Sequence, residues 1–377
     1  MLKIFKSSNM KKLFYFAAAA VALAACAKNE VIPVNSGENQ EITFNVAPKT
    51  KATTNKFADD LKFKSYAYYL PGNDIWANKA SSSELYINGV EISKTGGVWK
   101  NATTPYYWPK NGSLTFLAWT SLKETVGAPN SYVVSYVDNV TCSNTTGIKV
   151  ENYEVDSDKN KNVDFLVADI KADQAANTTT TGENGKYYND GVPTLFRHKL
   201  SYVIFNVVTD QNYSATKKFE LKSITFKDIE YKGTYQQIPA ASATEGWTVA
   251  AVKKDQTYYT APAAPTGTGT TGVEITSTAK TLTSDATQNY FLPQVFSNTD
   301  KLVITYEVTT TEGSSISVDH VEKEIVINPN EGLKMFESWV MGKKYTVTLT
   351  FKLDEILWDP AVENWDPVDA PTSGLTI

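Results

Sequence analysis

The chain has 377 residues, a formal net charge of −5 and a hydrophobic fraction of 42%. This length suits two domains of ordinary size better than one core. The acidic balance excludes a nucleic-acid-binding protein, which needs a basic surface for phosphates. Two cysteines exclude a fold built on several disulfides. With 8 Trp, 21 Tyr, 16 Phe and few helical periodicities, the composition favours an all-β protein.

The first 25 residues have the pattern of a signal peptide. Four lysines precede an apolar run, 13–25, that is too short to span a bilayer comfortably. The run ends in Leu23-Ala24-Ala25-Cys26, which resembles a bacterial lipobox, so we expect a lipid on Cys26 that anchors the chain to a membrane. An ordinary secretory signal with an incidental cysteine is the alternative.

Residues 26–40 are polar and predict a tether between the lipid and the fold. The next stretch, 41–46, alternates between apolar and polar residues. Its apolar residues Ile42, Phe44 and Val46 point to one side, which predicts a half-buried first strand.

A loop rich in small and polar residues follows this strand. It contains Lys49 and Lys51 and leads into Lys56. Such a loop offers an exposed backbone to a lysine-specific protease, so these three residues are candidate cleavage sites.

Short predicted strands then recur, separated by clusters of Gly, Asn, Ser or Pro, at the spacing of a sandwich or barrel. In the first half they are 61–70, 84–92, 98–99, 114–119, 132–137 and 163–168. A Thr- and Gly-rich loop follows, and we place a domain boundary near its end. The expected domains are 41–190 and 191–377.

The predicted strands of the second half are 194–208, 219–229, 247–252, 290–296, 301–309 and 321–327. Leu333, Phe336 and either Trp339 or Val340 fit one face of a brief helix. A last strand alternates over 345–353, with one apolar face formed by Tyr345, Val347, Leu349, Phe351 and Leu353.

Candidate catalytic and cofactor motifs are weak in this chain. Residues 267–272 match the dinucleotide fingerprint but lack a strand before them and a helix after them. The alternating acids and amides of 156–164 lack the glycine and the closing glutamate of a calcium loop. Neither His198 nor Cys142 has the neighbours of a catalytic base or nucleophile. We expect no enzyme, no cofactor and no metal.

Aromatic residues offer a rival interpretation. A cluster in the first half contains Trp76 and Trp108, whose rings, if exposed, could stack on glycans of a host or bacterial surface. The alternative function is therefore a surface lipoprotein adhesin for glycan or protein ligands, although most of these rings are expected in the core.

Taken together, four stretches resemble the fimbrillins of type V pili. They are the lipobox with the strand 41–46, the segment 106–119, the pair 163–168 and 196–201, and the region from Trp339 to Trp365. The resemblance spans the mature chain. It implies two transthyretin-like β-sandwich domains in tandem, which agrees with the strand count.

The resemblance also implies how such a subunit assembles. A lipidated precursor reaches the outer membrane, a trypsin-like protease cuts the loop after the first strand, and the strand leaves. A C-terminal strand of another subunit then fills the open groove, and the product is a fimbrium at the cell surface. In this chain 41–46 would be the strand removed, and the region beyond Tyr345 would be the donor strand.

Two departures from the family pattern bear on the role. The loop offers lysine where many shaft subunits are cut after arginine, and an uncut strand would indicate an anchor. The tail after Trp358 holds Pro360, Pro367 and Pro371, which make a poor central strand. The donor is therefore expected within 345–357, and a subunit without a donor would cap a tip.

Overall fold

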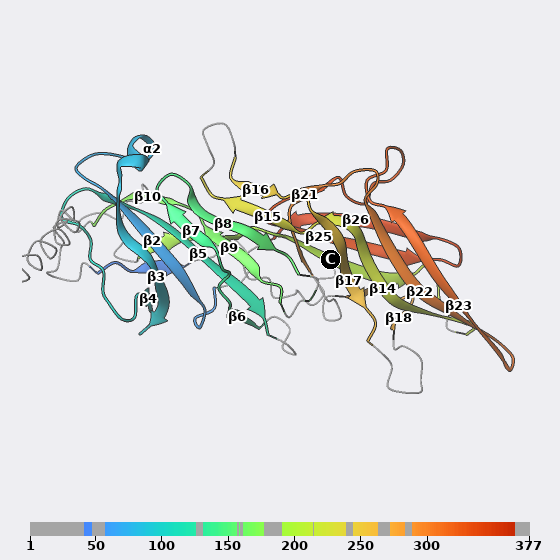
Figure 1. The fold of residues 1–377 in the computed structure, drawn as a ribbon. Helices are drawn as coiled ribbons and strands as arrows, with labels where there is room; N and C mark the ends of the chain where they lie inside the picture. The colour runs from blue at the N-terminus through green and yellow to red at the C-terminus, as the bar shows by residue number, and fades with distance from the viewer. Residues whose placement is uncertain are drawn as a thin grey trace, which may run out of the picture.

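The computed structural model describes residues 41–46, 57–125, 131–156, 158, 161–176, 191–213, 215–238, 244–262, 272–282 and 289–365. Within these ranges the chain is built from strands, with one four-residue helix, α2 (Trp76–Lys79), and one 3-10 turn, Ala80–Ser82 (Figure 1). The predicted all-β fold class is confirmed. No helix in these ranges is long and apolar enough to cross a membrane.

The first half of the chain is organised around a ten-stranded sheet. Its strands are β1 (Phe44–Val46), β2 (Lys62–Leu70), β3 (Glu84–Thr95), β4 (Val98–Lys100), β5 (Ser113–Glu124), β6 (Tyr132–Val134), β9 (Asp164–Ala168), β10 (Lys171–Gln174), β11 (Val192–Thr194) and β12 (Phe196–His198). The main path runs β11-β1-β4-β3-β2-β5-β9-β12, and β6 and β10 pair with β5.

The two ends of this path, β11 and β12, are separated in sequence by Leu195 alone. The sheet therefore curls back on itself. Its concave side holds the first core, which includes Ile42, Phe44, Phe57, Phe63, Trp99, Trp108, Leu114, Phe116 and Phe196. This core consists mainly of large aromatic rings, whose burial dominates its stabilisation.

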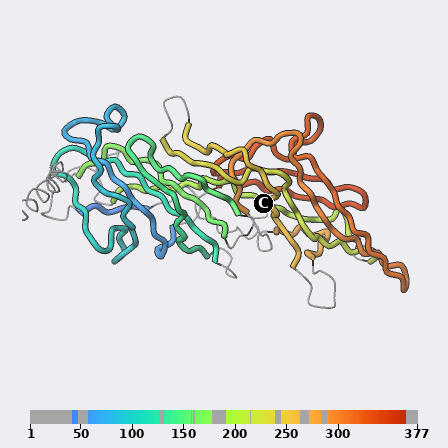
Figure 2. Tube along the Cα trace, viewed as in Figure 1, coloured from blue at the N-terminus to red at the C-terminus, as the bar shows by residue number. Residues whose placement is uncertain are grey.

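A second sheet connects the two halves of the sequence. It contains β7 (Val140–Ser143), β8 (Gly147–Glu154), β15 (Lys232–Gln236) and β16 (Gly246–Val249) in the order β16-β15-β8-β7. Figure 2 shows the later strands returning to lie beside the earlier ones. Between this connecting sheet and the ten-stranded sheet lies the middle core, which includes Leu117, Trp119, Ile148, Phe165, Tyr235 and Trp365.

The C-terminal part is formed by two five-stranded sheets and a short ladder. The β13–β25 sheet contains β13 (Ser201–Thr209), β19 (Lys280–Thr281), β20 (Tyr290–Phe291), β25 (Lys343–Phe351) and β26 (Ile356–Asn364). The β14–β22 sheet contains β14 (Lys217–Glu230), β17 (Lys253–Thr260), β18 (Val273–Ile275), β22 (Lys301–Glu312) and β23 (Ser315–Val326). The ladder pairs β21 (Gln294–Val295) with β24 (Ser338–Trp339).

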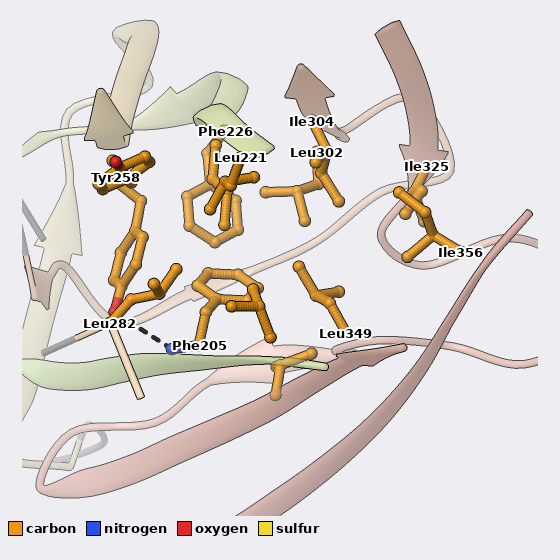
Figure 3. Close-up of a cluster of buried hydrophobic side chains, with 14 of the residues drawn as sticks. Phe205, Leu221, Phe226, Tyr258, Leu282, Leu302, Ile304, Ile325, Leu349 and Ile356 are labelled. Carbon is orange, nitrogen blue, oxygen red and sulfur yellow. Dashed lines mark hydrogen bonds between the residues drawn. The ribbon is translucent and has the colours of Figure 1, made fainter. Parts of the chain in front are cut away.

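Between these two sheets lies the last core (Figure 3). Alternate residues of each strand point into it, as expected for sheets buried on one face. Phe205 and Leu349 face Leu221 and Phe226 across the interface, and the backbone N–H of Phe205 donates to the Tyr258 hydroxyl at 3.1 Å. The hydroxyl of this buried tyrosine therefore has a hydrogen-bond partner.

The structure differs from the sequence-based expectations at several elements. The predicted strand 194–208 is interrupted at 195 and at 199–200, so it spans β11, β12 and β13, and the predicted strand 290–296 is divided into β20 and β21, which pair with different strands. The brief helix at 333–340 is wrong, because Ser338 and Trp339 pair with β21 and Trp339 is buried among aromatic rings of the last core. The strand predicted as the last one, 345–353, ends at Phe351 and is followed by β26, so Leu353 lies in the turn between β25 and β26 and is 51% exposed.

The expected division at residue 190 stays a prediction. Strands from both sides of that residue share the ten-stranded sheet, through β11 and β12, and the connecting sheet, through β15 and β16.

Candidate functional site

The first strand, β1, occupies an interior place in the ten-stranded sheet. It pairs in parallel with β11 over three residues and in antiparallel with β4 where Phe44 lies opposite Trp99. Just before it, Glu41 forms an isolated bridge with Tyr107. We call the place between β11 and β4 the β1 position.

The side chains of β1 confirm the predicted alternation. Ile42 and Phe44 are buried, and Val46 is partly buried against the first core. The Phe44 ring makes edge-on contacts with Phe63 and Phe116 at centroid distances of 5.5 and 5.7 Å. Burying each such side chain stabilises the fold by about 1.5–3 kcal/mol.

Besides the ladders with β11 and β4, few polar interactions hold the segment of β1 in place. The N–H of Ile42 donates to the carbonyl of Tyr106 at 2.7 Å, and the N–H of Val192 donates to the carbonyl of Thr43 at 2.7 Å. Lys100 and Glu41 form a partly exposed ion pair at 3.0 Å, a kind of contact that contributes little. The segment is thus held by its two ladders and by its buried apolar side chains.

Gly191 allows the backbone of β1 to approach closely. Its φ is +92°, and a Cβ placed on it would lie 2.6 Å from the carbonyl carbon of Phe44. A larger residue would therefore collide with β1 and also strain its own backbone. This glycine precedes β11 directly.

The lipidation site and the candidate cleavage sites, Cys26, Lys49, Lys51 and Lys56, lie outside the described residues. The chain is described again from Phe57, whose buried ring stacks on Phe196 at 5.1 Å. The lysine segment therefore joins two parts of the chain that both contribute to the first core.

The residues predicted as the donor strand form β25, apart from Leu353. Tyr345, Val347, Leu349 and Phe351 are all buried in the last core. β25 pairs on one side with β13 and on the other with β26, so both of its edges are occupied. The donor role remains a prediction.

β26 has a different environment. It pairs with β25 alone among the described strands, and most of its residues from Leu357 to Asn364 are exposed. Val362 is 57% exposed. Pro360 is tolerated because β26 is an edge strand and needs no N–H donor on its free side.

A groove of about 710 Å³ borders the free edge of β26. It lies between the start of β26 and the end of β23, which is the edge strand of the β14–β22 sheet. Ile325, Leu333 and Ile356 contribute apolar surface, and Lys323 crosses the seam to donate to the carbonyl of Asp354 at 3.0 Å. The two C-terminal sheets are therefore open along this seam.

The two candidate ligand-binding aromatics have different surroundings. Trp108 is 3% exposed and packs on Phe116 at 5.7 Å. A ring in the core cannot stack on a sugar, so the ligand role predicted for Trp108 is wrong. Trp76 is partly buried against Tyr68, and its ligand role remains a prediction.

Cys142 and His198 have structural surroundings. Burial raises the pKa of the Cys142 thiol to about 12, which disfavours the nucleophilic thiolate. The Nδ1 atom of His198 lies 2.6 Å from a carboxylate oxygen of Asp164, and its ring stacks on Trp365 at 3.6 Å. Sequence reasoning did not pair His198 with Trp365, because nothing in the local pattern of either segment links them.

Comparison with known proteins identifies the family. The model of a family described as fimbrillin-like matches residues 50–365. This chain belongs to the fimbrillin-like family. The family is one of fimbrial and adhesion proteins rather than of enzymes, and membership places this fimbrillin-like protein among components of the cell surface.

A solved fimbrial structure shares the fold of this fimbrillin-like protein. A fimbrial protein from Bacteroides vulgatus is 17% identical, with a TM-score of 0.58 over 87% of this chain and 100% of that chain. A putative cell adhesion protein from Bacteroides uniformis is 14% identical, with a TM-score of 0.45 over 86% of this chain and 98% of that chain. No curated protein matches the sequence.

Proposed function

We propose that this protein is a structural subunit of a type V-like fimbria. It is exported as a lipoprotein precursor through Cys26, reaches the outer membrane, and is assembled after a trypsin-like protease removes its first strand. The observation that carries this proposal is the place of β1, which is interior in its sheet and yet joined to the next core residue by a segment with Lys49, Lys51 and Lys56.

Loss of β1 would create an acceptor for another strand. It would open one edge each of β4 and β11, and it would uncover the rings of Phe63 and Phe116. An incoming strand with apolar residues at alternate positions would close both edges. Three side chains like Ile42, Phe44 and Val46 would stabilise the joint by roughly 5 kcal/mol before losses.

For the donor, the surroundings of the last two strands favour β26 over β25. Release of β25 would break two ladders and remove four buried side chains from the last core. Release of β26 would break one ladder, and only its ends, Ile356 and the following Trp365, are deeply buried. We therefore propose that the donated segment starts near Ile356 and leaves β25 in place. Because the ladder of β1 with β11 covers three residues, Pro360 would lie outside the paired part of the donated segment.

The mature N-terminus of the protein in isolated fimbriae tests the cleavage step. We expect a start just after Lys49, Lys51 or Lys56, with Cys26 and β1 absent. A start at an acylated Cys26 in every assembled subunit would overturn the proposed cleavage, because the β1 position would then still be filled by its own strand.

Crosslinking tests which strand fills the vacated position. A cysteine at Thr194 of β11 lies beside the β1 position and stays in the cut subunit, and one at Val362 marks β26. In fibres we expect a Thr194→Cys subunit to form a disulfide with a Val362→Cys subunit. A Val347→Cys subunit, with its residue on β25, is the matched control and should not react. The reverse pattern would assign the donor to β25.

A further inference from the structure

The C-terminal strand is fastened at its far end by one aromatic residue. Trp365 follows β26 and is 7% exposed, whereas the strand before it is largely exposed. Its ring lies nearly parallel to that of His198, with a centroid distance of 3.6 Å and an interplanar angle of 7°. It also stacks on Tyr202 and Tyr290, at 5.0 and 5.6 Å. This stack fixes the end of β26.

The residues beneath Trp365 are buried and hydrogen-bonded. The Nδ1 atom of His198 and a carboxylate oxygen of Asp164 are 2.6 Å apart, and both side chains are 4% exposed. The N–H of Trp365 donates to the carbonyl of Gly342, and the N–H of Gly342 donates to the carbonyl of Leu200, each at 2.9 Å. We call His198, Asp164 and Trp365 the latch.

The latch and the β1 position lie at opposite ends of one short segment, 192–198. β11 forms the start of this segment, and among the described strands its only ladder partner is β1. Phe196, in the middle, contacts Phe57 and Phe63 of the first core at 5.1 and 5.3 Å. His198, at the end, carries the stacked ring of Trp365.

We infer that segment 192–198 couples the β1 position to the latch, so that β26 is released only after β1 has left. With β1 in place, β11 is paired, Phe196 is packed, and the ladder of β12 with β9 runs from Phe196 to His198; together these contacts hold His198 beneath Trp365. Without β1, β11 loses its ladder and the core around Phe196 loses the packing of Phe44. A three-residue strand without a partner does not hold its geometry.

The inference rests on the proposed function and adds the order of its steps, in which β1 leaves first and β26 is released second. A precursor with β1 in place neither accepts a strand nor donates one, because segment 192–198 contributes both to the filled β1 position and to the latch that holds β26. Removal of β1 opens the acceptor and loosens the donor in the same molecule. The coupling requires two states of 192–198 whose balance depends on β1.

Hydrogen exchange of the unlipidated precursor, starting at Ala27, tests the coupling. A site for a sequence-specific protease replaces residues 50–55, so that cutting does not depend on the lysines. After the cut and loss of β1, we expect amides of β26 to exchange at least ~10-fold faster, while β14 and β22 are unchanged. Phe44→Asp, which puts a charge into the first core, should displace β1 without a cut and give the same result.

A second pair of variants separates the latch from general destabilisation. Trp365→Ala should raise the exchange of β26 in the uncut precursor and should add little after β1 has left, because both changes release the same strand. Trp76→Ala, a matched loss of an indole elsewhere, should leave β26 unchanged. The coupling would be overturned if the exchange of β26 did not change after loss of β1. It would also be overturned if the effects of Trp365→Ala and of the loss of β1 were fully additive.

The same samples distinguish this inference from the proposed function. Coupled exchange in a protein that never joins fibres would contradict strand exchange and leave the coupling intact. Fibres that form from cut subunits in which the exchange of β26 did not change would contradict the coupling alone.

Discussion

At the scale of single residues, the positive φ of Gly191 and its missing side chain allow β1 to lie close beside it. We expect Gly191→Ala to destabilise the precursor by about 1–3 kcal/mol, because alanine disfavours φ +92° and its Cβ would meet the Phe44 backbone. The free energy of unfolding in urea measures this loss.

Gly96→Ala is the matched control for Gly191. Gly96 also has a positive φ, +61°, but a Cβ there would meet nothing within 4 Å. Gly96→Ala should therefore lower the free energy of unfolding by less than Gly191→Ala does. After β1 has been removed, the two variants should become similar, and a persistent difference would contradict the contact with β1.

Asp300 is a second residue whose surroundings give a measurable prediction. It is 4% exposed, and burial alone would raise its pKa. Hydrogen bonds from the Ser297 N–H and hydroxyl and from Lys253, at 2.6, 2.9 and 2.9 Å, outweigh burial and lower the pKa overall. A carboxylate with a lowered folded-state pKa contributes stability above its unfolded pKa of about 3.9 and loses it as pH falls through the folded value.

We therefore expect Asp300→Asn to lower the free energy of unfolding by about 1–3 kcal/mol at pH 7 and by less near pH 3. Denaturant titrations at both pH values measure the difference. Asp59→Asn is the control, because Asp59 pairs with Lys94 at the surface and should change stability by less than about 1 kcal/mol. An equal effect of Asp300→Asn at both pH values would contradict this account.

At the scale of elements, the last two strands should differ in what their removal costs. A chain ending at Glu355 loses β26 and two deeply buried side chains, Ile356 and Trp365. We expect it to stay folded, with a stability lower by roughly 3–6 kcal/mol. Near-ultraviolet circular dichroism and the thermal midpoint test this.

The comparison chain ends at Met341 and lacks β25 as well. It loses four further buried side chains from the last core, a loss comparable to the whole stability of an ordinary domain. We expect it to unfold. Retention of a cooperative transition in this chain would contradict the central role of β25 and would restore it as a possible donor.

At the scale of the whole molecule, the connecting sheet ties the two halves together. β8 pairs with β15 across the expected boundary, and Tyr235 of β15 is fully buried in the middle core. We expect one calorimetric unfolding transition, because neither half keeps its sheet pairing without the other. Two separate transitions would show that the halves are independent.

The sequence predicted the features that depend on neighbouring residues, and it did not predict those that depend on contacts between residues far apart in the chain. Alternation within 41–46 correctly placed Ile42 and Phe44 inside, because a strand with one buried face has a period of two residues. The predicted helix at 333–340 was wrong because it rested only on the spacing of apolar residues within that segment. The segment is instead shaped by distant residues, through the ladder of β24 with β21 and the aromatic core around Trp339. Trp108 could not be placed inside or outside from its neighbours alone.

The sequence by itself determined the all-β class and the apolar face of the first strand, since composition and short periodicities decide both. The resemblance of several separated stretches also identified the fimbrillin family. Only the tertiary structure decided that β1 lies between β11 and β4, that β26 rather than β25 has a free edge, and that Trp365 rests on His198. These facts depend on contacts between residues far apart in the chain, which no local pattern encodes.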